Sequence, residues 1–254
     1  QSFDRLRIDP EQIRMGQKLI VKNRRIPYHL INVCSPRRQF TVAEYQRLAY
    51  RAIGDILRRG KLPIICGGTG LYVDAVVQGY RLPENQKSKI ENQKLRNRLR
   101  ALDLRQLLIR LSEVDPVTYR TIDRKNRRRV ERALEIYYQT GRPKSAPLEK
   151  FTPQYQFLTL GVKLPKAMLH RRIKQRLDQR LRQGLIAEVQ RLHRQGVSWR
   201  RLDNLGLEYR WVSRYLRNRV DRPTMERQLR ADIERFARRQ LTWFRHHGHV
   251  RWVS

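Results

Sequence analysis

The chain has 254 residues, with 57 Lys and Arg against 23 Asp and Glu, which gives a formal net charge of +34 at pH 7. With 39% apolar residues in regular periodic stretches it is no disordered tail, and no apolar run approaches the roughly 18 residues of a membrane span. Two cysteines, Cys34 and Cys66, cannot build a disulfide framework, which indicates a reducing cytoplasm.

The charge favours a polyanionic partner, because 45 of the basic residues are arginine and only 12 are lysine. Arginine presents a planar fork that matches phosphate and stacks on bases, so RNA, DNA or a diphosphate is the expected partner class. Drift in a GC-rich genome, which replaces surface Lys and Gln by Arg, is the alternative explanation of the excess.

The first 25 or so residues are polar and poorly periodic, and a pattern of alternating strands and helices follows them. We expect a strand at 28–33, a helix opened by the capping box Thr41–Glu44 and stopped at Gly60, an apolar strand at 62–66, a glycine turn at 67–70 and a helix at 71–78. This order predicts a parallel sheet with crossover helices.

From residue 84 to about 150 the pattern is helical only, with the clearest helix at 126–139. A strand at 157–164 comes next, followed by helices that contain Met168–Leu181, Ile186–Leu192 and Tyr209–Leu216, a long helix at 223–245 and a closing strand at 250–253. We therefore predict an α/β fold with a helical insertion and a helical C-terminal part. Residues 1–83 and 151–254 form the core and residues 84–150 the insertion.

The turn Gly67-Gly68-Thr69-Gly70 lies just past the carboxyl end of a predicted strand, where open parallel sheets bind ligands. Glycines there let backbone N–H groups approach an anion, and the Thr69 hydroxyl could bind phosphate or an attacking group. A turn that needs positive φ would explain the same glycines without any ligand.

Three arginine groups are candidates for anion or RNA binding. Several arginines in one helical turn repel each other unless an anion lies between them, although a solvated basic face remains the alternative for the first two groups. The third group mixes arginines, an amide and aromatic residues, which suits RNA. The groups are Arg127, Arg128, Arg129 and Arg132; Arg172 and Arg176; and the segment 238–245.

Six motifs occur in order at suitable spacing: Pro27–Asn32, Thr41–Tyr45, Gly60–Pro63, Gly67–Tyr72, Arg129–Glu135 and Arg239–Trp243. Together they resemble the tRNA dimethylallyltransferases, over a stretch that runs from about Gly16 to Trp252. The resemblance implies a P-loop-kinase-like parallel-sheet core. It also implies transfer of the dimethylallyl group of dimethylallyl diphosphate to N6 of adenosine 37, beside the anticodon of tRNA, with Mg²⁺ on the diphosphate.

The resemblance also implies roles for individual residues. Thr69 matches a threonine at the reaction channel that contacts tRNA and takes part in catalysis, and Gly67, Gly68, Arg172 and Arg176 are expected to bind diphosphate. Arg128 replaces the usual Gln of the family's tRNA-binding segment, and Glu208 stands where Gly is common. The expected tRNA contacts are Gln1, Thr69, Arg96, Arg128, Arg129, Arg132, Tyr209, Arg210, Arg238, Arg239, Gln240, Thr242, Trp243 and Arg245.

The family pattern opens with a first strand, a G-P-T-[AG]-S-G-K-[ST] loop and a D-S-x-Q motif with the expected general base, and none of these occurs in the 254 residues. We expect a fragment of an enzyme that lacks its N-terminal strands, with partial tRNA binding and no transferase activity of its own. A non-catalytic tRNA-binding relative is the first alternative, and a kinase-like transferase of small molecules is the second. A monomer in the cytoplasm, away from membranes, is expected.

Overall fold

The structure is a computed structural model, and it describes residues 18–21, 24–82, 89–147, 149–246 and 250–253. The chain divides into two compact units. The first unit comprises Gln1–Val77 with Pro153–Ser254, and the second comprises Gln78–Thr152. Each unit buries apolar side chains in a core of its own.

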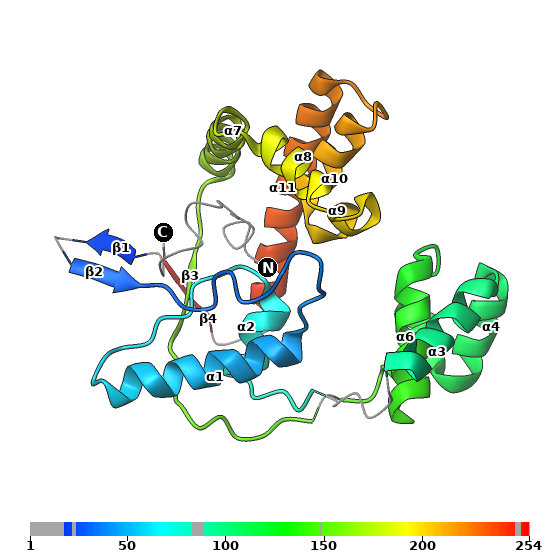
Figure 1. Cartoon of the computed structure of the whole chain (residues 1–254). Coiled ribbons are helices and arrows are strands. Elements are labelled where there is room, and N and C mark those ends of the chain that lie inside the picture. Colours follow the sequence, from blue (N-terminus) through cyan, green and yellow to red (C-terminus); the bar gives the residue numbers. More distant parts are fainter. Residues whose placement is uncertain (1–17, 22–23, 83–88, 148, 247–249, 254) are drawn as a thin grey trace. The chain divides into compact units, whose positions relative to one another are not determined.

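The first unit combines two short sheets with helices (Figure 1). Strands β1 (Lys18–Val21) and β2 (Arg24–Pro27) form an antiparallel hairpin. Strands β3 (Thr159–Val162) and β4 (Val250–Val253) pair in parallel, although about ninety residues of mostly helical chain lie between them. The helices are α1 (Val42–Arg58), α2 (Gly70–Val77), α7 (Lys166–Arg182), α8 (Leu185–Arg194), α9 (Trp199–Leu205), α10 (Leu207–Leu216) and α11 (Arg222–His246).

Local sequence sets where these helices begin and end. The predicted capping box opens α1, since the Thr41 hydroxyl accepts from Glu44 N and the Glu44 carboxylate accepts from Thr41 N. Gly184, at φ 92°, provides the left-handed residue between α7 and α8 that other residue types rarely adopt.

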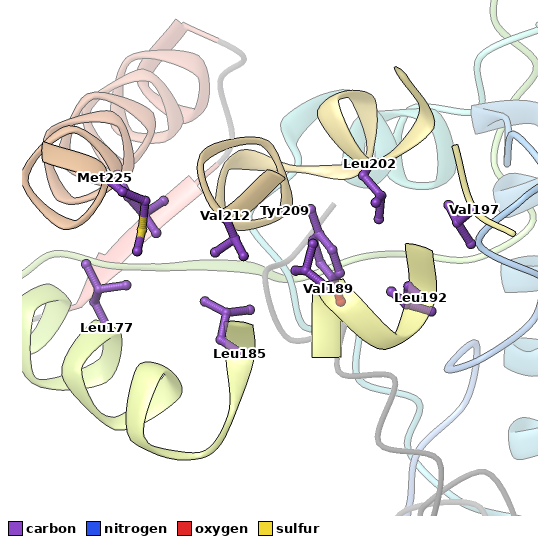
Figure 2. Packing of buried hydrophobic residues seen from close by; sticks show 10 residues of the cluster. Leu177, Leu185, Val189, Leu192, Val197, Leu202, Tyr209, Val212 and Met225 are labelled. Carbon is purple, nitrogen blue, oxygen red and sulfur yellow. The ribbon is translucent and has the colours of Figure 1, made fainter. Parts of the chain in front are cut away.

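The largest core of the first unit lies among the C-terminal helices (Figure 2). Leu177 from α7, Leu185 and Val189 from α8, Val212 from α10 and Met225 from α11 meet there with their side chains turned inward. A smaller core joins Tyr45, Ala49 and Ile53 of α1 to Val76 of α2. Since α11 packs against both α2 and α10, it connects the two cores of this unit.

The second unit is helical, with α3 (Lys89–Ala101), α4 (Leu104–Val114), α5 (Pro116–Thr121) and α6 (Arg127–Thr140). Asp115 ends α4 and caps α5, where its carboxylate accepts from Thr118 N at 3.0 Å and from Ser145 N at 2.9 Å. Burial alone would raise the pKa of Asp115, but these hydrogen bonds outweigh it and lower the pKa to about 2. Leu107, Leu111 and Leu134 are completely buried between the helices.

Two predicted strands do not form, and one pair of strands was not predicted. Residues 18–21 and 24–27, most of them in the polar and poorly periodic stretch at the start, form β1 and β2. The strand expected at 28–33 does not form, because Leu30 and Asn32 adopt φ values of 62° and 56° that interrupt an extended chain. The segment 62–66 is not a strand either: it pairs with no described strand, and Leu62 and Ile64 are 82% and 79% exposed.

The fold class is α/β, as predicted, with a small parallel sheet and mostly helical surroundings. The strand expected at 157–164 is β3, and the closing strand at 250–253 is β4. The predicted helices at 126–139 and 223–245 correspond to α6 and α11. These elements were predictable because their apolar residues repeat regularly and turn residues lie at their ends.

Candidate functional site

The predicted glycine turn leads directly into α2, which begins at Gly70. The Thr69 carbonyl accepts from Tyr72 N at 2.9 Å and from Val73 N at 3.1 Å, so Thr69 occupies the cap position of the helix. None of Gly67, Gly68 and Gly70 has a positive φ, so a left-handed turn does not explain these glycines.

Close approach of α11 explains two of the three glycines. A Cβ atom on Gly68 would overlap the amide of Gln240, and one on Gly70 would overlap the indole ring of Trp243. A Cβ on Gly67 would meet no described atom within 4 Å. Packing against the rigid indole ring therefore favours glycine at 70, a side chain at 68 would require the flexible end of Gln240 to move, and Gly67 faces open space.

Two hydrogen bonds hold α11 to the turn and to α2. Gln240 Nε2 donates to the carbonyl oxygen of Gly68 at 2.9 Å, and Trp243 Nε1 donates to Asp74 Oδ2 at 2.7 Å. The Asp74 side chain is buried, with 5% of its surface exposed. Gln240 and Trp243, predicted as tRNA contacts, thus point toward the turn.

Asp74 is not among the site residues predicted from the sequence. It is the one acidic residue in the apolar run Leu71–Val77, and a carboxylate inside such a run requires a polar partner. That signal was present, but the partner, Trp243, lies 169 residues further along the chain.

The Thr69 hydroxyl is buried and has no hydrogen-bond partner among the described residues. It borders a small pocket lined by Tyr45, Ile65, Cys66, Gly67, Thr69, Tyr72 and Val73. The rings of Tyr45 and Tyr72 stack in this wall, with centroids 4.8 Å apart. A buried hydroxyl without a partner carries a desolvation cost that a bound polar group would remove.

The rest of segment 238–245 faces outward. Arg238, Arg239, Thr242 and Arg245 are exposed. Arg239 lies over the ring of Phe236 at 5.6 Å, and Arg238 and Arg245 form no ion pair with described residues. These three guanidinium groups are therefore available to an external anion.

The arginines predicted in the second unit divide into paired and unpaired groups. Arg96 Nε and Arg132 Nη1 contact the two carboxylate oxygens of Glu135, at 3.3 and 3.0 Å. Arg128 and Arg129 are exposed, and their side chains have no ion-pair partner among the described residues. The unpaired arginines thus lie together at the start of α6.

The predicted diphosphate ligands Arg172 and Arg176 are both exposed on α7. They are four residues apart and share one side of the helix. Arg176 also acts inside the unit, since its charge offsets part of the rise that burial causes in the pKa of Glu208 in α10.

The structure places Tyr209 in the core, not on a surface that tRNA could reach. Its side chain is completely buried, and its hydroxyl donates to Glu188 Oε1. Burial and the neighbouring Glu188 carboxylate raise the pKa of Tyr209. The adjacent Arg210 is half-buried and donates through Nε to the Asp203 carbonyl at 3.0 Å. A direct tRNA contact of Tyr209 would require rearrangement of the core.

Glu208 is a buried acid beside Tyr209, with 6% of its surface exposed. Burial raises its pKa to about 7, although the positive charges of Arg180 and Arg176 offset part of that effect. The departure noted at this position, Glu in place of Gly, therefore puts an ionisable group inside the helical core.

Gln1 lies outside the described residues. Within the described ranges there is no group of three or more His, Cys, Asp or Glu side chains that could hold a metal ion. The described helices include none that is both long and apolar enough to cross a bilayer.

Comparison with known proteins gives a consistent result. The model of the IPP transferase family matches residues 15–247. tRNA dimethylallyltransferase 2 of Trichlorobacter lovleyi is 44% identical over 221 residues, which cover 87% of this chain and 70% of that protein. tRNA dimethylallyltransferase 1 of Syntrophus aciditrophicus is 40% identical over 260 residues, covering 100% of this chain and 79% of that protein.

Solved structures agree in fold. The full-length tRNA isopentenylpyrophosphate transferase of Bacillus halodurans is 33% identical with a TM-score of 0.60, covering 90% of this chain and 71% of that one. A eukaryotic dimethylallyltransferase acting on tRNA has a TM-score of 0.68 at 22% identity, over 90% of this chain and 60% of that one. These similarities are consistent with the predicted P-loop-kinase-like α/β core.

Proposed function

The chain belongs to the IPP transferase family, and from that premise we propose that it acts in the transfer of a dimethylallyl group from dimethylallyl diphosphate to tRNA. The proposed acceptor is the exocyclic N6 amine of adenosine 37 in the anticodon loop. In this family of tRNA dimethylallyltransferases, which are prenyltransferases, such a reaction forms a C–N bond and releases diphosphate.

One observation carries the proposal: the buried, unpartnered Thr69 hydroxyl borders a pocket on a turn that is fastened to an arginine-bearing helix. In the proposed complex Thr69 hydrogen-bonds the target adenosine, which has been turned out of the anticodon loop. Arg238, Arg239 and Arg245 of α11 and Arg128 and Arg129 of α6 contact RNA phosphates.

We assign the diphosphate to Gly67, Gly68, Arg172 and Arg176, because cations and backbone N–H groups must offset the charge of that leaving group. The Mg²⁺ ion remains a prediction from the family. Mg²⁺ commonly binds through one or two carboxylates together with substrate phosphates, so oxygens of the diphosphate would be among its ligands. The cytoplasmic location and the monomeric state also remain predictions.

A second candidate function is non-catalytic binding of tRNA. The exposed arginines without a described ion pair, Arg128 and Arg129 on α6 and Arg238 and Arg245 on α11, suit RNA phosphates whether or not a group is transferred.

Two measurements on the same chain separate the candidates. The first is binding of an anticodon stem-loop RNA as a function of salt, and the second is incorporation of labelled dimethylallyl groups into that RNA. We expect salt-dependent binding, with a log–log slope of roughly −0.7 per phosphate contact. Incorporation of the label would exclude the non-catalytic candidate, binding without incorporation would favour it, and absence of RNA binding would contradict both.

A further inference from the structure

The C-terminal segment of α11 has two faces with different tasks. Gln240 and Trp243 are three residues apart and lie on one side of the helix, toward the glycine turn. Arg238, Thr242 and Arg245 are exposed on the other side. The same two helical turns therefore carry residues directed at the protein and residues directed at solvent.

The inward face determines where the turn lies. Gln240 fixes the carbonyl of Gly68, and Trp243 fixes Asp74 one turn into α2, so α11 holds both sides of Thr69. Glycine at 68 and 70 allows this contact, since any Cβ atom there would overlap Gln240 or Trp243. The contact is therefore specific to these two side chains.

Nothing inside α2 fixes the hydroxyl of Thr69. A threonine at a helix N-cap ordinarily accepts from a backbone N–H of the first turn with its hydroxyl. Here the Thr69 carbonyl accepts from Tyr72 N and Val73 N, while the hydroxyl has no partner among the described residues. Its position relative to a bound RNA thus depends on what holds the turn from outside.

We infer that Gln240 and Trp243 are positioning residues, which set the Thr69 hydroxyl against the target adenosine while the arginines on the outer face of α11 hold the RNA. The inference rests on the proposed function. It gives the segment 238–245 a role beyond RNA contact: the helix that binds the RNA backbone also places the group that reads the base.

A double-mutant cycle on the full chain tests the inference. The readout is the affinity ratio between two anticodon stem-loop RNAs that carry adenosine or guanosine at the target position. We expect Thr69→Val to reduce this ratio about fivefold, as the loss of one hydrogen bond predicts. Trp243→Phe, which removes only the indole N–H donor, should reduce it by a similar factor. The double variant should lose no more than Thr69→Val alone.

The chain offers a matched control in Trp211. Its Nε1 donates to Asp232 Oδ2 at 2.8 Å, the same kind of bond as that between Trp243 and Asp74, within the C-terminal helices. Trp211→Phe should lower the free energy of unfolding by about as much as Trp243→Phe and leave the affinity ratio unchanged. If Trp243→Phe does not fold, Gln240→Met replaces it in the cycle, since it removes only the amide donor to Gly68.

The outcomes distinguish the inference from the proposed function. Equal affinity of the unmodified chain for the two RNAs would contradict the proposed reading of adenosine by Thr69. A clear preference for adenosine that Trp243→Phe or Gln240→Met leaves intact would overturn the inference alone. So would effects that add to that of Thr69→Val, or an equal loss of preference in Trp211→Phe.

Discussion

Arginine has opposite surroundings in two regions of the first unit. One region is the C-terminal helical body, formed by α7–α10 and residues 222–235 of α11, and the other is the last turns of α11, residues 236–246. In the helical body arginines contact carboxylates of the chain: Arg180 with Glu188, Arg217 with Asp203 and Arg230 with Glu234. After Glu234 the helix carries no acidic residue, and Arg238 and Arg245 have no ion-pair partner among described residues. The net charge of +34 therefore does not say which arginines are available to an external anion; the presence or absence of a carboxylate partner within the described structure distinguishes them.

The largest effect that we predict is on the free energy of unfolding, and it concerns Glu208 in the helical body. Its pKa of about 7 exceeds the 4.5 of an unfolded chain, so the unfolded state releases the proton first as pH rises. The stability contribution is complete below pH 4.5, falls between pH 4.5 and 7, and is then lost. We expect Glu208→Gln to be more stable than the parent chain at pH 8, by at most about 3 kcal/mol, and equally stable near pH 4.

Chemical denaturation of both chains across this pH range measures the difference. Glu226→Gln is the control, because Glu226 is only half-buried and its ion pair is with the exposed Arg222, at 2.9 Å. Its stability difference from the parent chain should change less with pH than that of Glu208→Gln. If Glu208→Gln were less stable at pH 8, the ionised carboxylate would be a net stabilising partner of Arg180 and Arg176.

The contact between the glycine turn and the last turns of α11 gives the second prediction. Gly70→Ala adds a Cβ that overlaps the rigid Trp243 indole, so overpacking should cost about 2 kcal/mol of unfolding free energy, less the gain in helix propensity. Gly67→Ala adds a Cβ with no described atom within 4 Å and should cost almost nothing. Thermal or denaturant unfolding compares them, and equal stabilities would mean that Trp243 moves aside freely.

The sequence predicted the position of the turn but assigned its glycines to an anion or to positive φ. The actual reason, the close approach of Gln240 and Trp243, joins segments about 170 residues apart, and no local pattern carries that information. The helices at 126–139 and 223–245 were predictable because their signals are local. The strands expected at 28–33 and 62–66 do not form. Positive φ values at Leu30 and Asn32 interrupt the first segment, and the second has no described strand to pair with, which apolar residues alone do not supply.

The segment 238–245 shows the same limit at the level of single residues. Resemblance to a family marks the whole segment as RNA-binding, whereas the structure directs Gln240 and Trp243 inward and Arg238 and Arg245 outward. Tyr209 is a similar case, since its pattern of neighbours in the sequence does not reveal that Glu188 binds its hydroxyl in the core. Residue type predicts what a side chain can contact, but packing decides which contact it makes.

The smallest expected effect tests the contrast between arginines most directly. Replacing Arg238, Arg239 and Arg245 together by Gln should weaken binding of an anticodon stem-loop about tenfold and reduce the salt slope by about two, because three phosphate contacts are lost. Replacing Arg222, Arg230 and Arg235 removes the same charge from the same helix, but these arginines already pair with Glu226, Glu234 and Asp232. Their triple variant should keep its salt slope nearly unchanged. Equal losses of RNA affinity in the two triple variants would mean that binding depends only on the net charge of α11. Ion pairs within the chain would then not distinguish the arginines that bind RNA from those that do not.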